Sequence, residues 1–304
     1  MAFDATKLAF GSALNKNAWL GLIKMKKNEN RNTDEWVVTN FGKEWRDFSN
    51  ESLDDAELFE MFQSYMSIFP WVSLPEKSVG FDAGCGSGRW AKYVAPKVET
   101  LHCVDASPEA IEVARELLSE HENVIFHSES INEFCIEENS CDFGYSLGVL
   151  HCVPNTQSAL NACASKLKTG APFLAYLYYD ISHSSLYMRT LFSIVSTARK
   201  VVSKLPHKVK KIITDLIALF VYFPLARFAR LVEFFGLEAS KIPLFQYRNR
   251  SFYVMRNDSL DRFGTAIEKR FSKEQVYSLF ENAGLSGTYI SPEPPWWVVL
   301  AWKT

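Results

Sequence analysis

The chain has 304 residues, of which 47% are hydrophobic and 14% aromatic. This composition supplies a well-buried core and is too polar overall for an integral membrane protein. The net charge of −2 gives no indication of a nucleic acid or another polyanion as partner, and no DNA binding is expected.

The cysteines and the N-terminus indicate a reducing compartment. No two cysteines form a CxxC pair, so we expect small core residues and neither disulfides nor a metal site. The six cysteines are Cys85, Cys103, Cys135, Cys141, Cys152 and Cys163. Residues 1–18 include Asp4, Lys7 and Lys16 and lack the apolar core of a signal peptide. We therefore expect a cytoplasmic protein.

Residues 1–76 are expected to be helical and to form an N-terminal lid. An aromatic cluster, Trp36, Phe41, Trp45 and Phe48, lies within them. Phe41 and Trp45 either close over a ligand or belong to the core.

A glycine-rich segment follows this region. The run VGFDAGCGSG, residues 79–88, reads as a buried strand that ends in Asp82 and enters a glycine-rich turn. Such a turn lets the backbone approach a small ligand closely. A second acid, Asp105, ends the next apolar run about twenty residues later, a spacing that suits a carboxylate bound to ribose. The segment therefore predicts a site for a nucleoside cofactor.

Strand and helix patterns alternate from residue 78 to residue 180 and again after residue 270. The predicted strands are 78–82, 100–105, 124–128, 143–147, 173–179, 287–291 and 296–302. The predicted helices are 87–94, 108–120, 157–168 and 273–282. This rhythm predicts an α/β fold with a doubly wound, mostly parallel sheet of seven strands. Residues 77–180 and 271–304 would form its core.

Residues 181–270 interrupt the rhythm as a basic helical insertion between the fifth strand and the last helix. Residues 181–230 carry nine Lys or Arg and one acid, Asp215, a local charge of +8. The apolar run after Asp215 extends for about eleven residues and contains Pro224, which predicts that it is too short to span a bilayer. Three interpretations stay open. The insertion caps an acceptor pocket, forms a homodimer face, or touches anionic lipid or a lipid-linked substrate.

The glycine turn favours S-adenosylmethionine over NAD or FAD. Gly84, Gly86 and Gly88 are spaced as GxGxG, and Arg89 stands where a dinucleotide fold has its third glycine. Asp82 would repel a pyrophosphate and attract an amino group. With the further motifs VDAS (104–107) and CDFGYSLGVLHCVPN (141–155), the chain resembles the class I S-adenosylmethionine-dependent methyltransferases. Within that class it is similar to the small-molecule enzymes of bacterial natural-product and glycan gene clusters. The segments FGKEW (41–45) and DSLDRF (258–263) are also similar to that group.

The resemblance implies a Rossmann-like methyltransferase fold and a binding site for S-adenosylmethionine, with S-adenosylhomocysteine as the product. Asp82 would hold the methionine amino group, and Asp105 would accept both ribose hydroxyls. The remaining implied cofactor residues are Gly84, Cys85 and Gly86 at the methionine, Ala106, Glu129, Ser130 and Ile131 at the adenine, and Leu147 near the sulfonium.

The acceptor side of the site is predicted from the strand ends. His151 follows the fourth strand and is the candidate general base, with a structural role in the loop as the alternative. Tyr178, Tyr179, Asp180 and His183 end or follow the fifth strand, where one or two would line the acceptor pocket. A histidine base favours O-methylation of a secondary metabolite or glycan sugar. The basic insertion, with Arg248, Arg250 and Arg262, suits an anionic acceptor.

Three other functions stay open. Methylation of tRNA or another nucleic acid would use the basic insertion, although Ser146-Leu147-Gly148-Val149 stands where amino-group methyltransferases of nucleic acids carry an Asn/Asp-Pro-Pro-Tyr motif. A catalytically inactive, cofactor-binding scaffold subunit is the second, and a dehydrogenase is the third.

Overall fold

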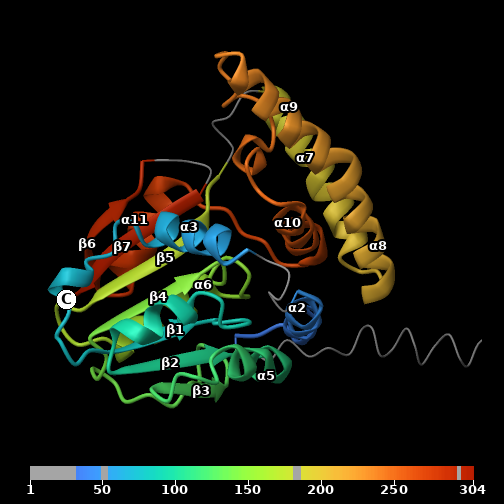
Figure 1. Ribbon diagram of the computed structural model, residues 1–304. Helices are drawn as coiled ribbons and strands as arrows, with labels where there is room; N and C mark the ends of the chain where they lie inside the picture. Colours follow the sequence, from blue (N-terminus) through green and yellow to red (C-terminus); the bar gives the residue numbers. More distant parts are fainter. Residues whose placement is uncertain (1–31, 49–53, 181–185, 293–295) are drawn as a thin grey trace, which may run out of the picture.

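A computed structural model describes residues 32–48, 54–180, 186–292 and 296–304 (Figure 1). The predictions made for residues 1–31 and for His183 lie outside these residues.

The core is a seven-stranded sheet in the order β3-β2-β1-β4-β5-β7-β6. Neighbouring strands are parallel except β7, which runs antiparallel to both β5 and β6. The strands are β1 (Val79–Ala83), β2 (Thr100–Asp105), β3 (Val124–Ser128), β4 (Phe143–Leu147), β5 (Pro172–Tyr178), β6 (Leu285–Ile290) and β7 (Trp296–Lys303). The predicted doubly wound α/β fold is confirmed.

Helices cover both faces of the sheet (Figure 1). On one face pack α3 (Asp55–Met66), α4 (Ala91–Val94) and α5 (Pro108–Leu117), through a core that includes Phe62, Leu101 and Phe143. On the other pack α6 (Thr156–Lys166) and α11 (Lys273–Asn282), through a core that includes Phe81 and Phe280. Short 3-10 turns, η1 (Trp71–Ser73) and η2 (Ala95–Lys97), complete these layers.

Local sequence signals explain where several helices begin. The Ser107 hydroxyl accepts a hydrogen bond from the Ala110 amide, and Pro108 occupies the first turn of α5, as predicted. Ser272 and Gln275 form a reciprocal capping box at the start of α11. The predicted helix 87–94 is shorter, because Gly88 adopts a φ of +78° and only α4 is helical. All six cysteines are free, and only Cys135 is exposed.

The insertion forms two long helical rods and a third helix packed against them (Figure 1). The first rod is α7 (Leu186–Val202), and the second joins α8 (His207–Ile217), the π-helical turn η3 (Ala218–Tyr222) and α9 (Phe223–Phe234). A short turn, η4 (Phe245–Tyr247), leads to α10 (Phe252–Gly264). Met255 and Phe263 of α10 share a small apolar core with Val202 and Tyr222 of the rods.

The helix over residues 207–234 corrects the sequence prediction for the apolar run. It continues through Pro224 for 28 residues and is, by length and composition, long and apolar enough to cross a membrane. Proline interrupts an α-helix because its ring clashes with the carbonyl group four residues earlier. Here the π turn η3 ends two residues before Pro224 and includes Phe220, the residue whose carbonyl group the ring would meet, so the wider turn accommodates the proline.

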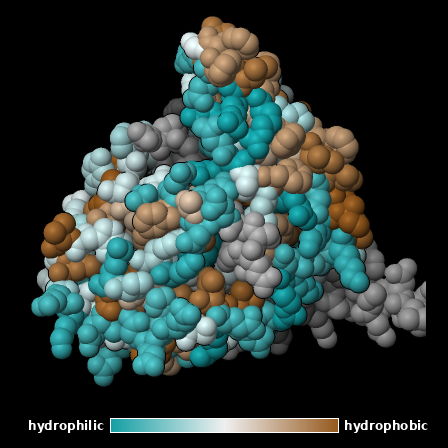
Figure 2. All heavy atoms as spheres, viewed as in Figure 1, coloured by the Kyte–Doolittle hydropathy of each residue, from teal (hydrophilic) through white to brown (hydrophobic). Residues whose placement is uncertain are grey.

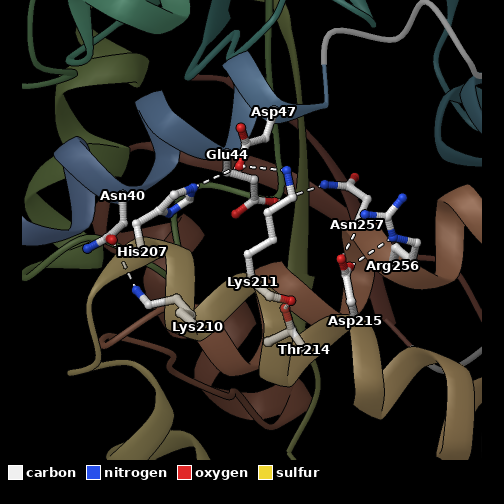
Figure 3. A network of polar contacts seen from close by, with 10 residues as sticks. All are labelled: Asn40, Glu44, Asp47, His207, Lys210, Lys211, Thr214, Asp215, Arg256 and Asn257. Carbon is white, nitrogen blue, oxygen red and sulfur yellow. Dashed lines mark hydrogen bonds and ion pairs between the residues drawn. The ribbon is translucent and has the colours of Figure 1, made fainter.

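Polar contacts attach α8 to α10 and to the N-terminal helix α2 (Glu35–Asp47), as Figure 3 shows. Lys210 donates to the Asn40 side chain at 3.0 Å, and Lys211 pairs with Asp47 at 3.0 Å. Asp215 accepts both hydrogen bonds of a bidentate contact from Arg256, each of 2.8 Å. Two basic residues of the insertion, Lys210 and Lys211, are therefore bonded to helix α2.

Candidate active site

A cavity lies at the carboxyl edge of the sheet, where β1 and β4 lie side by side although they are not consecutive in sequence. Ligands bind at this kind of switch point in open parallel sheets. Helices α2 and α10 supply the rest of the wall. The predicted site residues that line the cavity are Phe41, Trp45, Gly84, Cys85, Gly86, Asp105, Ala106, Ile131, Leu147 and Tyr178.

The glycine turn forms the floor of this cavity. Gly84 and Gly86 have φ values of +88° and +54°, a region that side chains disfavour. A Cβ added at Gly86 would come within 2.8 Å of the Trp45 ring. The Gly84 amide donates to the carbonyl oxygen of Val104 at 2.7 Å, which ties the turn to β2. The turn therefore offers bare backbone to a ligand held under Trp45.

Asp105 is fixed at the end of β2. Its two carboxylate oxygens accept hydrogen bonds from the Ser107 amide at 2.8 Å and from the Gly86 amide at 2.9 Å. Burial raises the pKa of the carboxyl group, and the two amides partly offset this rise. Each oxygen keeps acceptor capacity toward the cavity, so the carboxylate can bind a pair of hydroxyl groups.

Asp82 is buried beneath the turn with 1% of its surface exposed. Within the described chain, neither carboxylate oxygen has a hydrogen-bond partner. Burial raises its pKa to about 8, the nearby Tyr145 hydroxyl lowers it, and the charge of Asp105 raises it further. Asp82 does not itself line the cavity, and a positively charged amino group bound at the turn would favour its ionised form.

Asp82→Asn is expected to stabilise the ligand-free protein at pH values near 8. The raised pKa means that the native state holds this proton more tightly than the unfolded chain does. As the pH rises from the ordinary carboxyl range to about 8, the unfolded chain releases this proton while the native state keeps it, so stability is lost over that range. We expect Tm to increase by about 2 °C or more near pH 8 and to change less near pH 5, while affinity for S-adenosylhomocysteine falls.

The matched control for this variant is Asp142→Asn. Asp142 accepts hydrogen bonds from Lys168 at 2.7 Å and from the Val79 amide at 2.9 Å, so its loss should lower Tm near pH 8. A lower Tm for Asp82→Asn under the same conditions would contradict the claim that burial of Asp82 lowers the stability of the ligand-free protein.

The predicted adenine contacts divide into two groups. Ile131 lines the cavity. Glu129 does not, because its carboxylate accepts the amide of Cys135 at 2.8 Å. Ser130 is buried and is not part of the wall. Of these three predicted residues, only the apolar Ile131 contributes to the cavity wall.

His151 lies behind the cavity wall. Its ring stacks on Tyr178 with the ring centroids 3.9 Å apart, and it is 1% exposed. Tyr178 lines the cavity and His151 does not. Burial lowers the pKa of His151 to about 4, so its ring is neutral near pH 7 and is separated from the cavity by Tyr178. Tyr179 points to the other side of β5, where its ring lies 6.1 Å from that of Trp297.

Carboxylates on α2 and α10 were not assigned to the site from the sequence, yet they line the cavity. Glu44 accepts a hydrogen bond from Asn257 at 2.9 Å, and Asp258 accepts one from the Tyr222 hydroxyl at 2.9 Å. Asp261 lies 3.5 Å from the Tyr178 hydroxyl. The segments FGKEW (41–45) and DSLDRF (258–263), which contain Glu44 and the two aspartates, were the signals in the sequence that could have indicated them.

The pKa values of two of these groups are raised. Burial raises the pKa of Asp261 to about 7, and the charges of Asp258 and Glu268 add to the effect. Burial, followed by the charge of Asp261, raises that of Glu44 well above its ordinary value. Among the described residues, the one basic side chain in the wall is Arg89, whose guanidinium lies 4.6 Å from the ring centroids of both Trp45 and Trp90. Acids therefore outnumber bases on this part of the wall.

The basic residues expected to meet an acceptor lie elsewhere. Arg248 pairs with Glu233 at 2.7 Å, Arg250 with Glu60 at 3.3 Å and Arg262 with Asp258 at 3.3 Å. None of these arginines lines the cavity, and none of the nine basic residues of 181–230 does. The charge of the insertion therefore gives no support to an anionic acceptor. The insertion contributes to the wall through η4 and α10, with Tyr247, Val254, Asn257 and the two aspartates.

Residues 81–175 match the family model described as a methyltransferase domain. The chain therefore carries a methyltransferase domain. The matched residues include the glycine turn, Asp105 and β4, so the domain supplies the cofactor side of the cavity. No significant match emerges from comparison of the sequence with curated proteins.

Solved methyltransferase structures share the fold. One is the S-adenosylmethionine-dependent methyltransferase, possible histamine N-methyltransferase, of Thermotoga maritima, with 14% identity and a TM-score of 0.50 over 88% of this chain and 100% of that chain. Another is the Burkholderia thailandensis 1,6-didemethyltoxoflavin-N1-methyltransferase, with 13% identity and a TM-score of 0.50 over 89% of this chain and 88% of that chain. At this level of identity the likeness shows the fold.

Proposed function

We propose that this methyltransferase acts on a small molecule that bears a basic nitrogen, held against α2 and α10. The observation that carries the proposal is the part of the cavity wall formed by α2 and α10, where Glu44, Asp258 and Asp261 lie among aromatic rings. An amino sugar or an amine-bearing secondary metabolite fits this description.

The donor side of the site suits S-adenosylmethionine, which supplies an electrophilic methyl group on a sulfonium when bound. Asp105 would accept the two ribose hydroxyls. The turn at Gly84 and Gly86 would lie along the methionine chain under Trp45, and Asp82 would compensate its amino group, directly or through water. Leu147, at the tip of β4, would exclude water near the sulfonium.

The charge of the acceptor wall favours a cation over an anion. A positive group beside Glu44 and Asp261 would relieve the unfavourable burial that raises their pKa values. Tyr65, Tyr176, Tyr178 and Tyr247 also line the cavity, and aromatic faces attract ammonium groups. An anionic acceptor would meet these carboxylates with only Arg89 to compensate it.

Asp261 is the proposed proton acceptor. A bound ammonium group must first lose a proton to free its nitrogen lone pair; the N–C bond then forms as the C–S bond breaks with its electrons on sulfur. A carboxylate whose pKa is about 7 can receive that proton at neutral pH. O-methylation with His151 as base, favoured from the sequence, stays a prediction that would require Tyr178 to move aside.

An acceptor panel tests the proposal. Purified protein is incubated with S-adenosylmethionine labelled in its methyl group and with amines, neutral alcohols and phosphorylated sugars of similar size. We expect label in amines, at the nitrogen. Transfer to phosphorylated sugars with none to amines would contradict the assigned acceptor chemistry.

A further inference from the structure

The second rod of the insertion exposes a continuous apolar face. Ile212, Leu216, Phe220 and Phe228 are 61%, 49%, 70% and 54% exposed, and they follow a spacing of four residues that continues through the exposed Pro224. The buried residues Lys210, Thr214 and Tyr222 follow the same spacing two positions away, so the exposed residues lie on the side of the rod that faces away from the protein. The rod ends in a group of exposed apolar residues, Leu231, Phe234, Phe235 and Leu237. We call these residues together the rod face, and Figure 2 shows the apolar surface along this helix.

The opposite side of the rod is attached to the protein. Lys210, Thr214 and Tyr222 are buried there, and Tyr222 donates a hydrogen bond to Asp258 of α10. Only 28% of the most apolar window of this helix is buried, which distinguishes it from a core helix. Because one side of this helix is attached to the protein, only the other side is free for contact. The helix can therefore lie on a membrane surface but is not free to cross the membrane.

Basic residues frame the rod face. At one end of the rod, Lys208 lies four residues before Ile212 and so continues the spacing of the rod face. Lys200 and Lys204 precede Lys208, near the turn between α7 and α8. Arg230 is exposed at the other end. Among the described residues these four side chains form no ion pair, whereas the two acids of the rod, Asp215 and Glu233, are each paired with an arginine.

We propose that the rod face binds the surface of an anionic lipid bilayer, with the helix lying in the plane of the interface. Apolar side chains on one face with lysine and arginine beside them are the composition of helices that lie in this way. Lipid headgroups would meet the basic residues while the phenylalanines enter the acyl boundary. At 1.5 Å per residue the rod is about 42 Å long, so its whole length can contribute.

A bilayer explains these features better than a second copy of the chain does. Both ends of the rod face carry unpaired basic residues. Two copies packed face to face would therefore bring like charges together in either relative direction, whereas an anionic surface compensates them all.

Vesicle flotation with the full-length protein tests the proposal. We expect it to float with vesicles of phosphatidylcholine and phosphatidylserine and to bind pure phosphatidylcholine more weakly. Phe220→Glu combined with Phe228→Glu should reduce binding to the mixed vesicles by more than roughly tenfold, because two anionic side chains would then face the anionic interface. The matched control is Val72→Glu, since Val72 is fully exposed on η1, outside the rod; its binding should equal that of the wild type.

A second variant tests the charge. Lys200→Gln, Lys204→Gln and Lys208→Gln together should lower affinity for the mixed vesicles by more than roughly tenfold and reduce its dependence on salt.

Binding of S-adenosylhomocysteine should be unchanged in every variant, which shows that the fold is intact. Absence of vesicle binding by the folded wild type, or equal binding by the phenylalanine variant, would overturn the proposal. A dimer in light scattering that the same variant dissociates would assign the rod face to a second copy instead.

Discussion

Asp105→Ala is expected to weaken S-adenosylhomocysteine binding by roughly 10²-fold or more, because it removes two hydrogen bonds between ribose hydroxyls and a charged acceptor. The carboxylate lines the cavity at the end of β2. Isothermal titration calorimetry of the purified variant measures the loss directly.

The alanine also removes the acceptor of the Gly86 and Ser107 amides, so a conservative variant is needed. Asp105→Asn keeps the shape and one carbonyl oxygen, and it should still lose at least about tenfold in affinity because its amide nitrogen cannot accept a hydroxyl proton. Circular dichroism checks the fold of both proteins. Affinity close to that of the wild type in both variants would remove Asp105 from the ribose site.

Asp261→Asn is expected to lower kcat by ~10²–10⁴ while leaving S-adenosylhomocysteine affinity nearly unchanged. An amide retains the shape of the side chain but cannot take a proton. In the wild type, activity should rise with pH through about 7, since the reactive form of Asp261 is the ionised carboxylate. The variant should lack this inflection. The measurement is a pH profile of initial rates with an acceptor identified from the panel.

Two matched variants sharpen this result. Asp215→Asn changes an acid that is paired with Arg256 and does not line the cavity, and it should leave kcat within about twofold. His151→Gln should keep the inflection near pH 7, because Tyr178 separates that ring from the cavity. If His151→Gln removes the inflection and Asp261→Asn retains it, His151 is the base and Asp261 is not.

Most residues that the sequence predicted for the cofactor side line one cavity in the structure, because they come from neighbouring segments of the chain. An acid before a glycine turn and a second acid at the next strand end lie within about thirty residues of one another. Parallel pairing of β1 with β2 brings them to the same edge of the sheet, with Asp82 opposite Cys103 and Asp105 two residues farther on. Topology alone fixes this proximity.

The acceptor side could not be predicted in the same way, since its residues come from distant parts of the chain. Glu44 and Asn257 are hydrogen-bonded although 213 residues separate them. Their contact depends on how α10 folds back over α2, which no periodicity encodes. His151 was placed correctly after β4, but side-chain packing decided that Tyr178 rather than His151 faces the cavity. The local charge of the insertion also misled, because Lys210 and Lys211 of α8 are bonded to α2 and α10 and no basic residue of 181–230 lines the cavity.

Calorimetric titration of the wild-type protein with S-adenosylhomocysteine tests the central claim most directly, which is that the turn at Gly84 and Gly86, with Asp82 and Asp105, binds this nucleoside cofactor. We predict saturable binding of one ligand per chain and no competition from NAD. Absence of binding, or binding that NAD displaces equally well, would contradict the account.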